Sequence, residues 1–149
     1  RRAADSEYLT ACFSEIHRHN RWGSAESASG PGSELAATAE VRRGLPPLLR
    51  EFGVRTVLDA PCGDFHWMKE LDLPVERYIG ADVVAEIIER NRGRYAAANR
   101  EFLVADLDSE RSLRAAESSG SLDGKPHGRL VRYRRALRAR RECLEWPAR

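Results

Sequence analysis

The sequence predicts an α/β fold, and three observations lead to that prediction. Strand-like and helix-like segments alternate between residues 54 and 105, a glycine turn follows the first strand, and the alternation stops after Asp108. Strand, helix, strand, helix and strand in that order are typical of a parallel sheet with crossover helices. We therefore expect a Rossmann-like, doubly wound parallel sheet that is truncated after its third strand.

Each element of the alternating region follows from its apolar pattern and its flanking residues. Short, largely apolar runs predict the strands, and longer segments with apolar side chains at helical spacing predict the helices. We expect the three strands to be parallel neighbours, with the first strand between the other two. The predicted strands are 54–60, 78–82 and 101–105, and the predicted helices are 65–71 and 84–98.

The N-terminal segment, residues 1–53, has a different character. Apolar residues at helical spacing predict an amphipathic helix over 7–19, and the Gly-, Ser- and Pro-rich run 20–33 predicts a loop. A second helix should begin at Glu34 and end near Arg43. Pro46 and Pro47 should interrupt it, because proline lacks the N–H donor and clashes with the preceding turn.

Residues 109–149 form a basic tail that differs from the rest of the chain. Residues 1–108 carry 14 basic and 18 acidic side chains, whereas 109–149 carry 11 and 5. We expect 109–128 to be poorly ordered, and a weakly packed helix to span 130–144. The change in composition near Asp108 is interpreted as a truncation or frameshift of a longer gene. An Arg-rich face that binds nucleic acid is less favoured than a solvated one.

Composition limits the other classes of protein. A length of 149 residues suits a single domain, and no apolar run is long enough to span a bilayer. The three cysteines are far apart, so neither a disulfide framework nor a metal site is predicted. Reduced thiols and a cytoplasmic location are therefore expected.

The candidate site is the turn after the first strand, because ligands of open parallel sheets bind at the carboxyl ends of the strands. Gly63 permits close approach of a ligand, and Pro61 stiffens the turn. The free N–H groups of the following helix should face a carboxylate or hydroxyl. The predicted binding residues, with no catalytic residue assigned, are Asp59, Pro61, Cys62, Gly63, Asp64, Asp82, Val83 and Asp106.

Three of the acids have expected roles. Asp82 ends the second strand 19 residues after Gly63, close to the spacing of a carboxylate that binds ribose hydroxyls. Asp106 ends the third strand, where it is either an adenine contact or a plain turn acid. Asp59 either borders the ligand or caps the following helix. Cys62 is read as a packing residue rather than a nucleophile, since no histidine has motif spacing to it.

The charge of the turn favours one cofactor over another. A dinucleotide brings a pyrophosphate and usually requires a G-x-G-x-x-G turn. Here the turn has one glycine between Asp59 and Asp64, which would repel phosphates. S-Adenosylmethionine (SAM) brings an ammonium and a sulfonium, and both are attracted to carboxylates. SAM is therefore favoured over NAD. A nicotinamide-dependent oxidoreductase and a non-enzymatic remnant or basic binding module remain the alternatives.

Three segments resemble the motifs of class I SAM-dependent methyltransferases of the bacterial type. They are 57–63 (VLDAPCG), 78–82 (YIGAD) and 102–106 (FLVAD), and the run 20–33 also resembles a segment that precedes the first motif. The resemblance implies that 54–108 is a partial SAM-binding domain with an unidentified methyl acceptor. It places Asp59 and Gly63 at the methionine end, Asp82 at the ribose and Asp106 at the adenine. Phe65 departs from the pattern, because many members carry a third glycine there.

Overall fold

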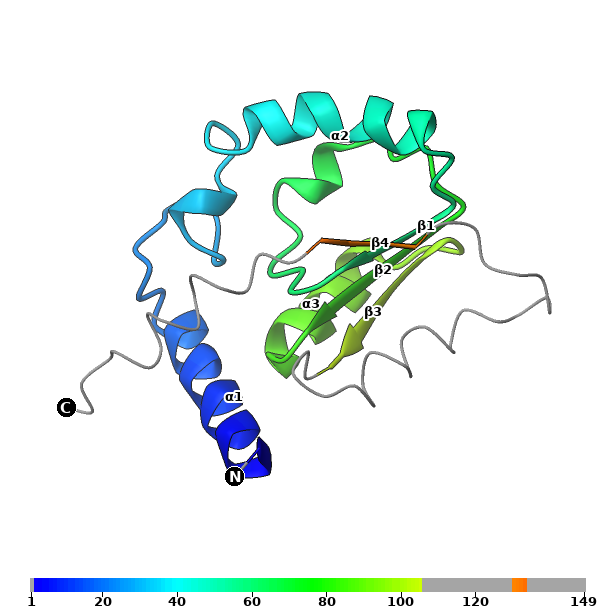
Figure 1. Cartoon of the computed structure of the whole chain (residues 1–149). Helices are drawn as coiled ribbons and strands as arrows, with labels where there is room; N and C mark the ends of the chain where they lie inside the picture. The colour runs from blue at the N-terminus through cyan, green and yellow to red at the C-terminus, as the bar shows by residue number, and fades with distance from the viewer. Residues whose placement is uncertain (1, 106–129, 134–149) are drawn as a thin grey trace.

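The structure, a computed structural model, describes residues 2–105 and 130–133. Its helices and strands are arranged as an α/β unit around a parallel sheet (Figure 1). The helical elements are α1 (Arg2–Arg18), the 3-10 turn η1 (Pro31–Ser33), α2 (Ala39–Glu51), the 3-10 turn η2 (Met68–Glu70) and α3 (Ala85–Tyr95). The strands are β1 (Thr56–Asp59), β2 (Arg77–Asp82), β3 (Arg100–Val104) and β4 (Leu130–Tyr133).

The sheet confirms the predicted fold class but not the predicted strand order. All its pairings are parallel, and the order is β3-β2-β1-β4. The expectation that the first strand lies between the other two is wrong, since β2 occupies that place. The alternation of elements predicts parallel strands but leaves their order open, and consecutive strands are usually neighbours.

The fourth strand corrects two further expectations. Leu130–Tyr133 pairs with β1 from Thr56↔Leu130 to Asp59↔Tyr133, so the sheet does not end at its third strand, and these residues are not helical. The arginines suggested a basic helix face, yet Leu, Val and Tyr within four residues also suit a strand. Pairing with β1 satisfies backbone groups that a buried strand cannot leave open. The expected disorder of 109–128 lies outside the described residues.

Two other elements differ from expectation. The helix predicted over 65–71 is only η2, because Gly63 and Phe65 both have left-handed φ angles, +57° and +58°, which no α-helix accommodates. In contrast, α2 continues through Pro46 and Pro47 instead of stopping near Arg43. Each proline removes only its own N–H bond. Leu45 and Leu49, which flank the pair, pack against the core and hold the helix in place.

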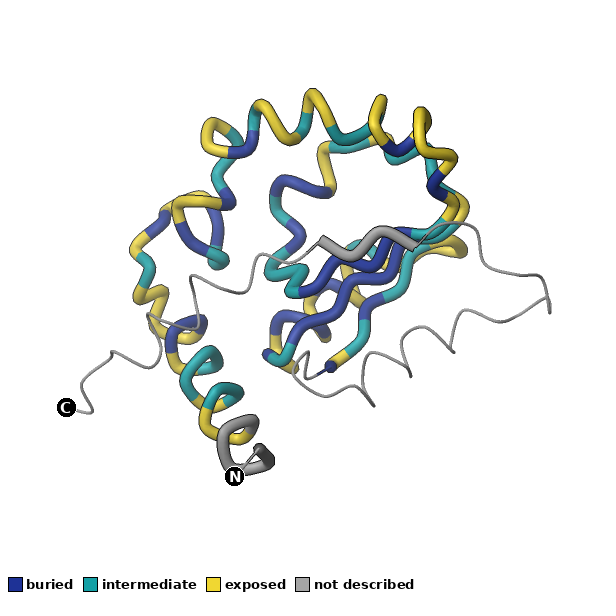
Figure 2. Tube along the Cα trace, viewed as in Figure 1, coloured by how far each residue is buried: buried dark blue, intermediate teal, exposed yellow. Residues whose placement is uncertain are grey.

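Buried residues occupy both faces of the sheet (Figure 2). On one face, Val57, Tyr78 and Phe102 pack with Ile88 of α3 and Leu49 of α2. On the opposite face, Leu58, Ile79 and Ala81 form a second cluster with Ala60 and Ala105. This alternation along each strand follows from the two-residue repeat of a strand. The position of α1 is fixed in part by Arg18, which pairs with Glu86 of α3 at 2.5 Å.

Phe65 is the centre of the first cluster. Its ring is 2% exposed and lies 5.2 Å from the rings of Tyr78, Tyr95 and Phe102, with the Arg100 guanidinium also 5.2 Å from its centroid. The left-handed backbone costs an L-residue about 1–2 kcal/mol. Burial of the aromatic ring outweighs that cost, since removing such a ring typically costs about 3–5 kcal/mol.

We predict that glycine is less destabilising than alanine at position 65, which reverses the usual effect of these two residues on stability. Phe65→Ala should destabilise the chain by about 3–5 kcal/mol, because it leaves a cavity among three rings. Phe65→Gly should be more stable than Phe65→Ala by about 1 kcal/mol, because glycine adopts a positive φ without strain. Urea denaturation measures both values. If Phe65→Gly is the less stable of the two, the backbone at this position is not left-handed in solution.

Candidate functional site

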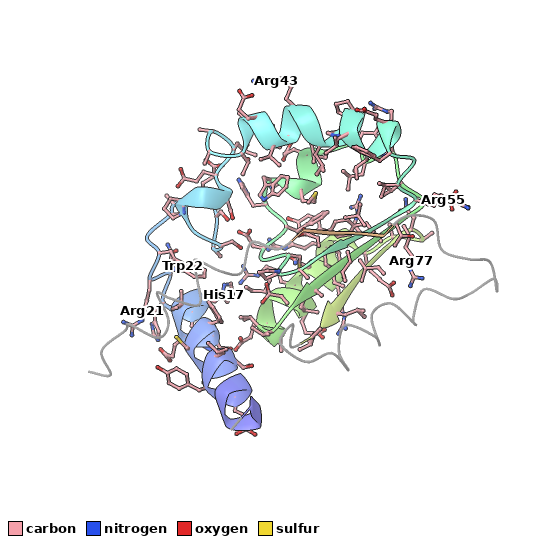
Figure 3. The ribbon with its side chains drawn as sticks, in the orientation of Figure 1. His17, Arg21, Trp22, Arg43, Arg55 and Arg77 are labelled. Atoms are coloured by element: carbon pink, nitrogen blue, oxygen red, sulfur yellow. The ribbon has the colours of Figure 1, made fainter. Side chains whose placement is uncertain are left out.

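The two ends of β1 and β2 differ in charge, because the amino ends carry arginines paired with acids and the carboxyl ends carry aspartates. Arg55 precedes β1 and Arg77 begins β2, whereas these strands end at Asp59 and Asp82. Figure 3 shows Arg55 and Arg77 together at the edge remote from α1. Arg55 pairs with Glu76 at 2.6 Å, and Arg77 pairs with Glu101. The carboxyl edge is therefore the acidic edge, and it is where open parallel sheets bind their ligands.

The glycine turn, residues 60–64, connects the end of β1 to the acids. Its peptide bond Ala60–Pro61 is cis, and Gly63 has a φ of +57°. The turn lies directly against β2, because Cys62 N donates to Ala81 O at 2.9 Å. Gly63 N donates to Asp82 Oδ2 at 3.0 Å. The 19-residue spacing noted in the sequence therefore corresponds to a direct hydrogen bond.

Every backbone N–H from Cys62 to His66 has a partner within the chain. Beyond the two bonds to β2, Asp64 N donates to Ser29 Oγ at 2.9 Å. Phe65 N donates to Cys62 O at 3.4 Å, and His66 N to Asp64 Oδ1 at 3.3 Å. The expected row of free N–H groups at a helix N-terminus is thus absent from this turn. An anion would find no open backbone donor there.

Asp82 is a buried carboxylate that joins two elements. It is 5% exposed, and its second oxygen, Oδ1, accepts a hydrogen bond from Val84 N at 3.0 Å, just before α3. Burial raises the pKa of this carboxyl, and its bonds from backbone N–H groups oppose that shift only in part. Each oxygen of a carboxylate can accept a second hydrogen bond. Asp82 therefore positions the turn while keeping acceptor capacity.

Asp59 lies deeper in the sheet, next to the aromatic cluster. It is 4% exposed and accepts a hydrogen bond from Tyr78 Oη at 2.5 Å. Burial and the neighbouring carboxylate raise the pKa of Tyr78 well above its usual value. No α-helix follows the turn, so Asp59 does not cap one. Its charge nevertheless contributes to the acidic edge.

Asp64 contacts a segment far away in the sequence. We call residues 24–33 the serine loop. Asp64 accepts hydrogen bonds from Ser27 Oγ at 3.0 Å to both of its oxygens, from Ala28 N at 2.8 Å and from Ser29 Oγ at 3.0 Å. The predicted ligand contact is therefore an anchor of the serine loop.

Cys62 is a free thiol in the glycine turn. Burial raises its pKa well above the usual value, and the charges of Asp59 and Asp82 raise it further. A raised pKa favours the thiol over the reactive thiolate, and the side chain packs against the hydrophobic core. Cys12, in contrast, is disulfide-bonded, which corrects the expectation of reduced thiols at that position.

Three predicted site residues remain, and the structure describes two of them. Pro61 and Val83 are both half-buried and adjoin the turn and Asp82. Asp106 lies outside the described residues. No described helix is long and apolar enough to cross a bilayer.

Two groups at the site were missed by the sequence interpretation. Asn91 of α3 is fully buried and donates from Nδ2 to Gly63 O at 2.8 Å, which fixes the peptide plane of the turn. Its place among Ile87 and Ile88 on the apolar face was an available signal. Glu26 Oε1 lies 2.7 Å from His66 Nε2 and accepts from Leu35 N at 2.6 Å. No local pattern links two residues 40 positions apart.

Residues at the end of α1 lie on the same side of the molecule as the serine loop. His17 and Trp22 lie near one another there, far from Arg43 on α2 (Figure 3). His17 is 9% exposed, and burial together with Arg90 lowers its pKa. Its Nδ1 has no hydrogen-bond partner in the described part of the chain. Trp22 packs against Gly30, so it anchors the serine loop.

Comparisons with known proteins give limited information. No protein-family profile and no curated protein matches the sequence significantly. One similar solved structure is a Haloferax volcanii complex between the Trm112 methyltransferase activator and a protein assigned as a methyltransferase. The identity is 19%, the TM-score is 0.41, and the match covers 65% of this chain and 40% of that chain. At this level the match assigns neither a family nor an activity.

The contact between Gly63 and Ser29 gives a prediction with an internal control. A Cβ at Gly63 would overlap Ser29 Oγ and lie 3.0 Å from Ser29 Cβ, whereas a Cβ at Gly53, with a similar φ of +58°, meets nothing within 4 Å. Gly53→Ala should cost only backbone strain, about 1 kcal/mol. Gly63→Ala should cost about 1–3 kcal/mol more, because its methyl group collides with the serine loop.

A double-mutant cycle tests the cause of that difference. Combining Gly63→Ala with Ser29→Gly should cost at least about 1 kcal/mol less than the two single changes added together. Combining Gly53→Ala with Ser29→Gly should be additive. Urea denaturation of the six proteins provides the data. Additive costs at both glycines would mean that Ser29 does not lie on the glycine turn.

Proposed function

We propose that this chain carries the SAM-binding part of a class I methyltransferase of the bacterial type, acting on an unidentified methyl acceptor. The observation that carries the proposal is the buried Asp82 carboxylate at the carboxyl end of β2, bonded to Gly63 N of the glycine turn. A carboxylate at this place offers oxygens to the two hydroxyls of a ribose, and hydrogen bonds to charged acceptors are strong.

The charges around the turn favour SAM over a nucleotide with phosphates. Asp82 bonds to Gly63 N, Asp64 follows Gly63 in the chain, and Asp59 ends β1. A positively charged ligand is attracted to carboxylates of this kind. A pyrophosphate would meet the same carboxylates without the backbone donors that bind phosphates elsewhere, because the N–H groups from Cys62 to His66 are already bonded. The lack of open backbone donors in the turn disfavours a nicotinamide-dependent oxidoreductase.

The roles of the residues follow from their places. When bound, SAM supplies an electrophilic methyl group on a sulfonium. Asp82 would hold the ribose, with Val83 beside it, and Gly63 would border the methionine end. Asn91 and Asp82 keep the turn rigid through its carbonyl and its N–H. We assign no catalytic residue among these, because all of them position the ligand or the turn.

Calorimetry with SAM, S-adenosylhomocysteine and NAD tests the proposal. We expect the full chain to bind the two SAM-type ligands and not NAD. Asp82→Asn should weaken SAM binding roughly ten- to a hundredfold, because a hydrogen bond to a charged acceptor contributes about 1.5–3 kcal/mol. Asp72→Asn is the matched control, since Asp72 is exposed and lies outside the glycine turn, beyond η2.

Thermal unfolding must accompany these titrations, because Asp82 also accepts hydrogen bonds from backbone N–H groups. An asparagine turns an N–H donor toward either Gly63 N or Val84 N, so some loss of stability is expected. The comparison is made at a temperature where each variant is folded. Binding of NAD in preference to SAM, or equal SAM affinity in Asp82→Asn and the unmodified chain, would contradict the proposal.

A further inference from the structure

The serine loop is held in place by side chains rather than by regular structure. Apart from η1, residues 24–33 contain no helix or strand. Ser24, Ser27 and Ser33 are nevertheless 5%, 2% and 3% exposed. Within the loop, Ser24 Oγ accepts from Ser27 N at 3.0 Å. Buried polar groups of this kind need partners. Ser24 Oγ donates to Glu34 Oε1 at 2.8 Å, and Ser27 Oγ donates to Asp64 of the glycine turn.

Asp64 concentrates those partners on one carboxylate. Its Oδ2 accepts from Ala28 N at 2.8 Å, and its Oδ1 accepts from His66 N at 3.3 Å and from Ser29 Oγ at 3.0 Å. Ser27 Oγ lies 3.0 Å from both oxygens. Asp64 N returns a bond to Ser29 Oγ at 2.9 Å, so the two segments are joined in both directions.

The two backbone donors make a carboxylate necessary. Ala28 N and His66 N are fixed donors on opposite oxygens of Asp64. An asparagine has one oxygen and one NH₂ group. Its NH₂ group would therefore face one of these two backbone N–H donors, and that hydrogen bond would be lost. Serine hydroxyls can rotate to accommodate either group, but backbone amides cannot. Asp64→Asn therefore removes the anchor with almost no change in side-chain size.

The serine loop lies against Gly63 of the glycine turn. Ser29 Oγ fills the space next to Gly63 where a Cβ would be, and the neighbouring N–H of Gly63 is bonded to Asp82. A ligand that extends from Asp82 along the glycine turn must therefore pass the serine loop. With the ribose at Asp82 and the methionine end at Gly63, as proposed above, the portion of SAM beside the serine loop would be its amino-acid portion.

We propose that Asp64 is a positioning residue that holds the serine loop as one wall of the site for the amino-acid portion of SAM. The inference rests on the proposed function and goes beyond it, because it assigns residues 27–29 to the cofactor site and removes Asp64 from the ligand contacts. Glu26 of the serine loop adds a second contact between the two segments, to His66 just after the glycine turn.

Two ligands that differ only in the amino-acid portion test the inference. S-Adenosylhomocysteine contains it, and 5′-methylthioadenosine lacks it. With the full chain, Asp64→Asn should weaken S-adenosylhomocysteine roughly tenfold or more and change 5′-methylthioadenosine by less than about twofold. Asp72→Asn should leave both affinities unchanged. Amide hydrogen exchange at residues 27–29 should be faster in Asp64→Asn without ligand.

Each other outcome overturns the inference in a recognisable way. Equal weakening of both ligands means that Asp64 only supports the fold, and no weakening means that the loop is not part of the site. If Asp64→Asn does not fold, Ser27→Ala removes one donor to the same carboxylate. It must then weaken S-adenosylhomocysteine more than 5′-methylthioadenosine. If the unmodified chain binds neither ligand, the proposed function fails as well. If it binds both ligands and the variant changes both affinities equally, only this inference is rejected.

Discussion

The hydrogen bond from Gly63 N to Asp82 Oδ2 joins the ends of two neighbouring strands, and the site is arranged around it. It fixes the glycine turn against β2, so that Gly63 O reaches Asn91 of α3 and the α-carbon of Gly63 faces Ser29. Asp82 Oδ1 extends the same connection to Val84 N at the start of α3. A single buried carboxylate thus sets the geometry of one turn, one helix and, through Gly63, one loop.

Phe65 shows what that geometry requires of the sequence. Phe65, two residues after Gly63, also has a left-handed backbone conformation. Many of the methyltransferases whose motif the sequence resembles have a third glycine at this position. Here the strain is offset by a ring buried among Tyr78, Tyr95 and Phe102. The motif and the hydrophobic core are therefore one unit, because the residue that completes the turn is also the centre of the core.

Sequence patterns predict well what depends on local periodicity. Apolar spacing predicts the strands that end at Asp59 and Asp82 and the helix that carries Ile87 and Ile88. The spacing of 19 residues between Gly63 and Asp82 predicts that the two lie together at the ends of neighbouring strands. Contacts between remote segments leave no such trace. Nothing in the sequence shows that Ser27 lies against Asp64, and the arginines around β4 suggested a helix instead of a strand.

The most direct test of this account is an NMR titration of the ¹⁵N-labelled chain with S-adenosylhomocysteine. We expect the largest amide shift changes at Ser29, Gly63, Val83 and Val84, which lie in or against the glycine turn or next to Asp82. Arg55 and Arg77, at the opposite edge of the sheet, should be unaffected. Changes concentrated at that opposite edge, or none at the glycine turn at saturating ligand, would contradict the assignment of the site.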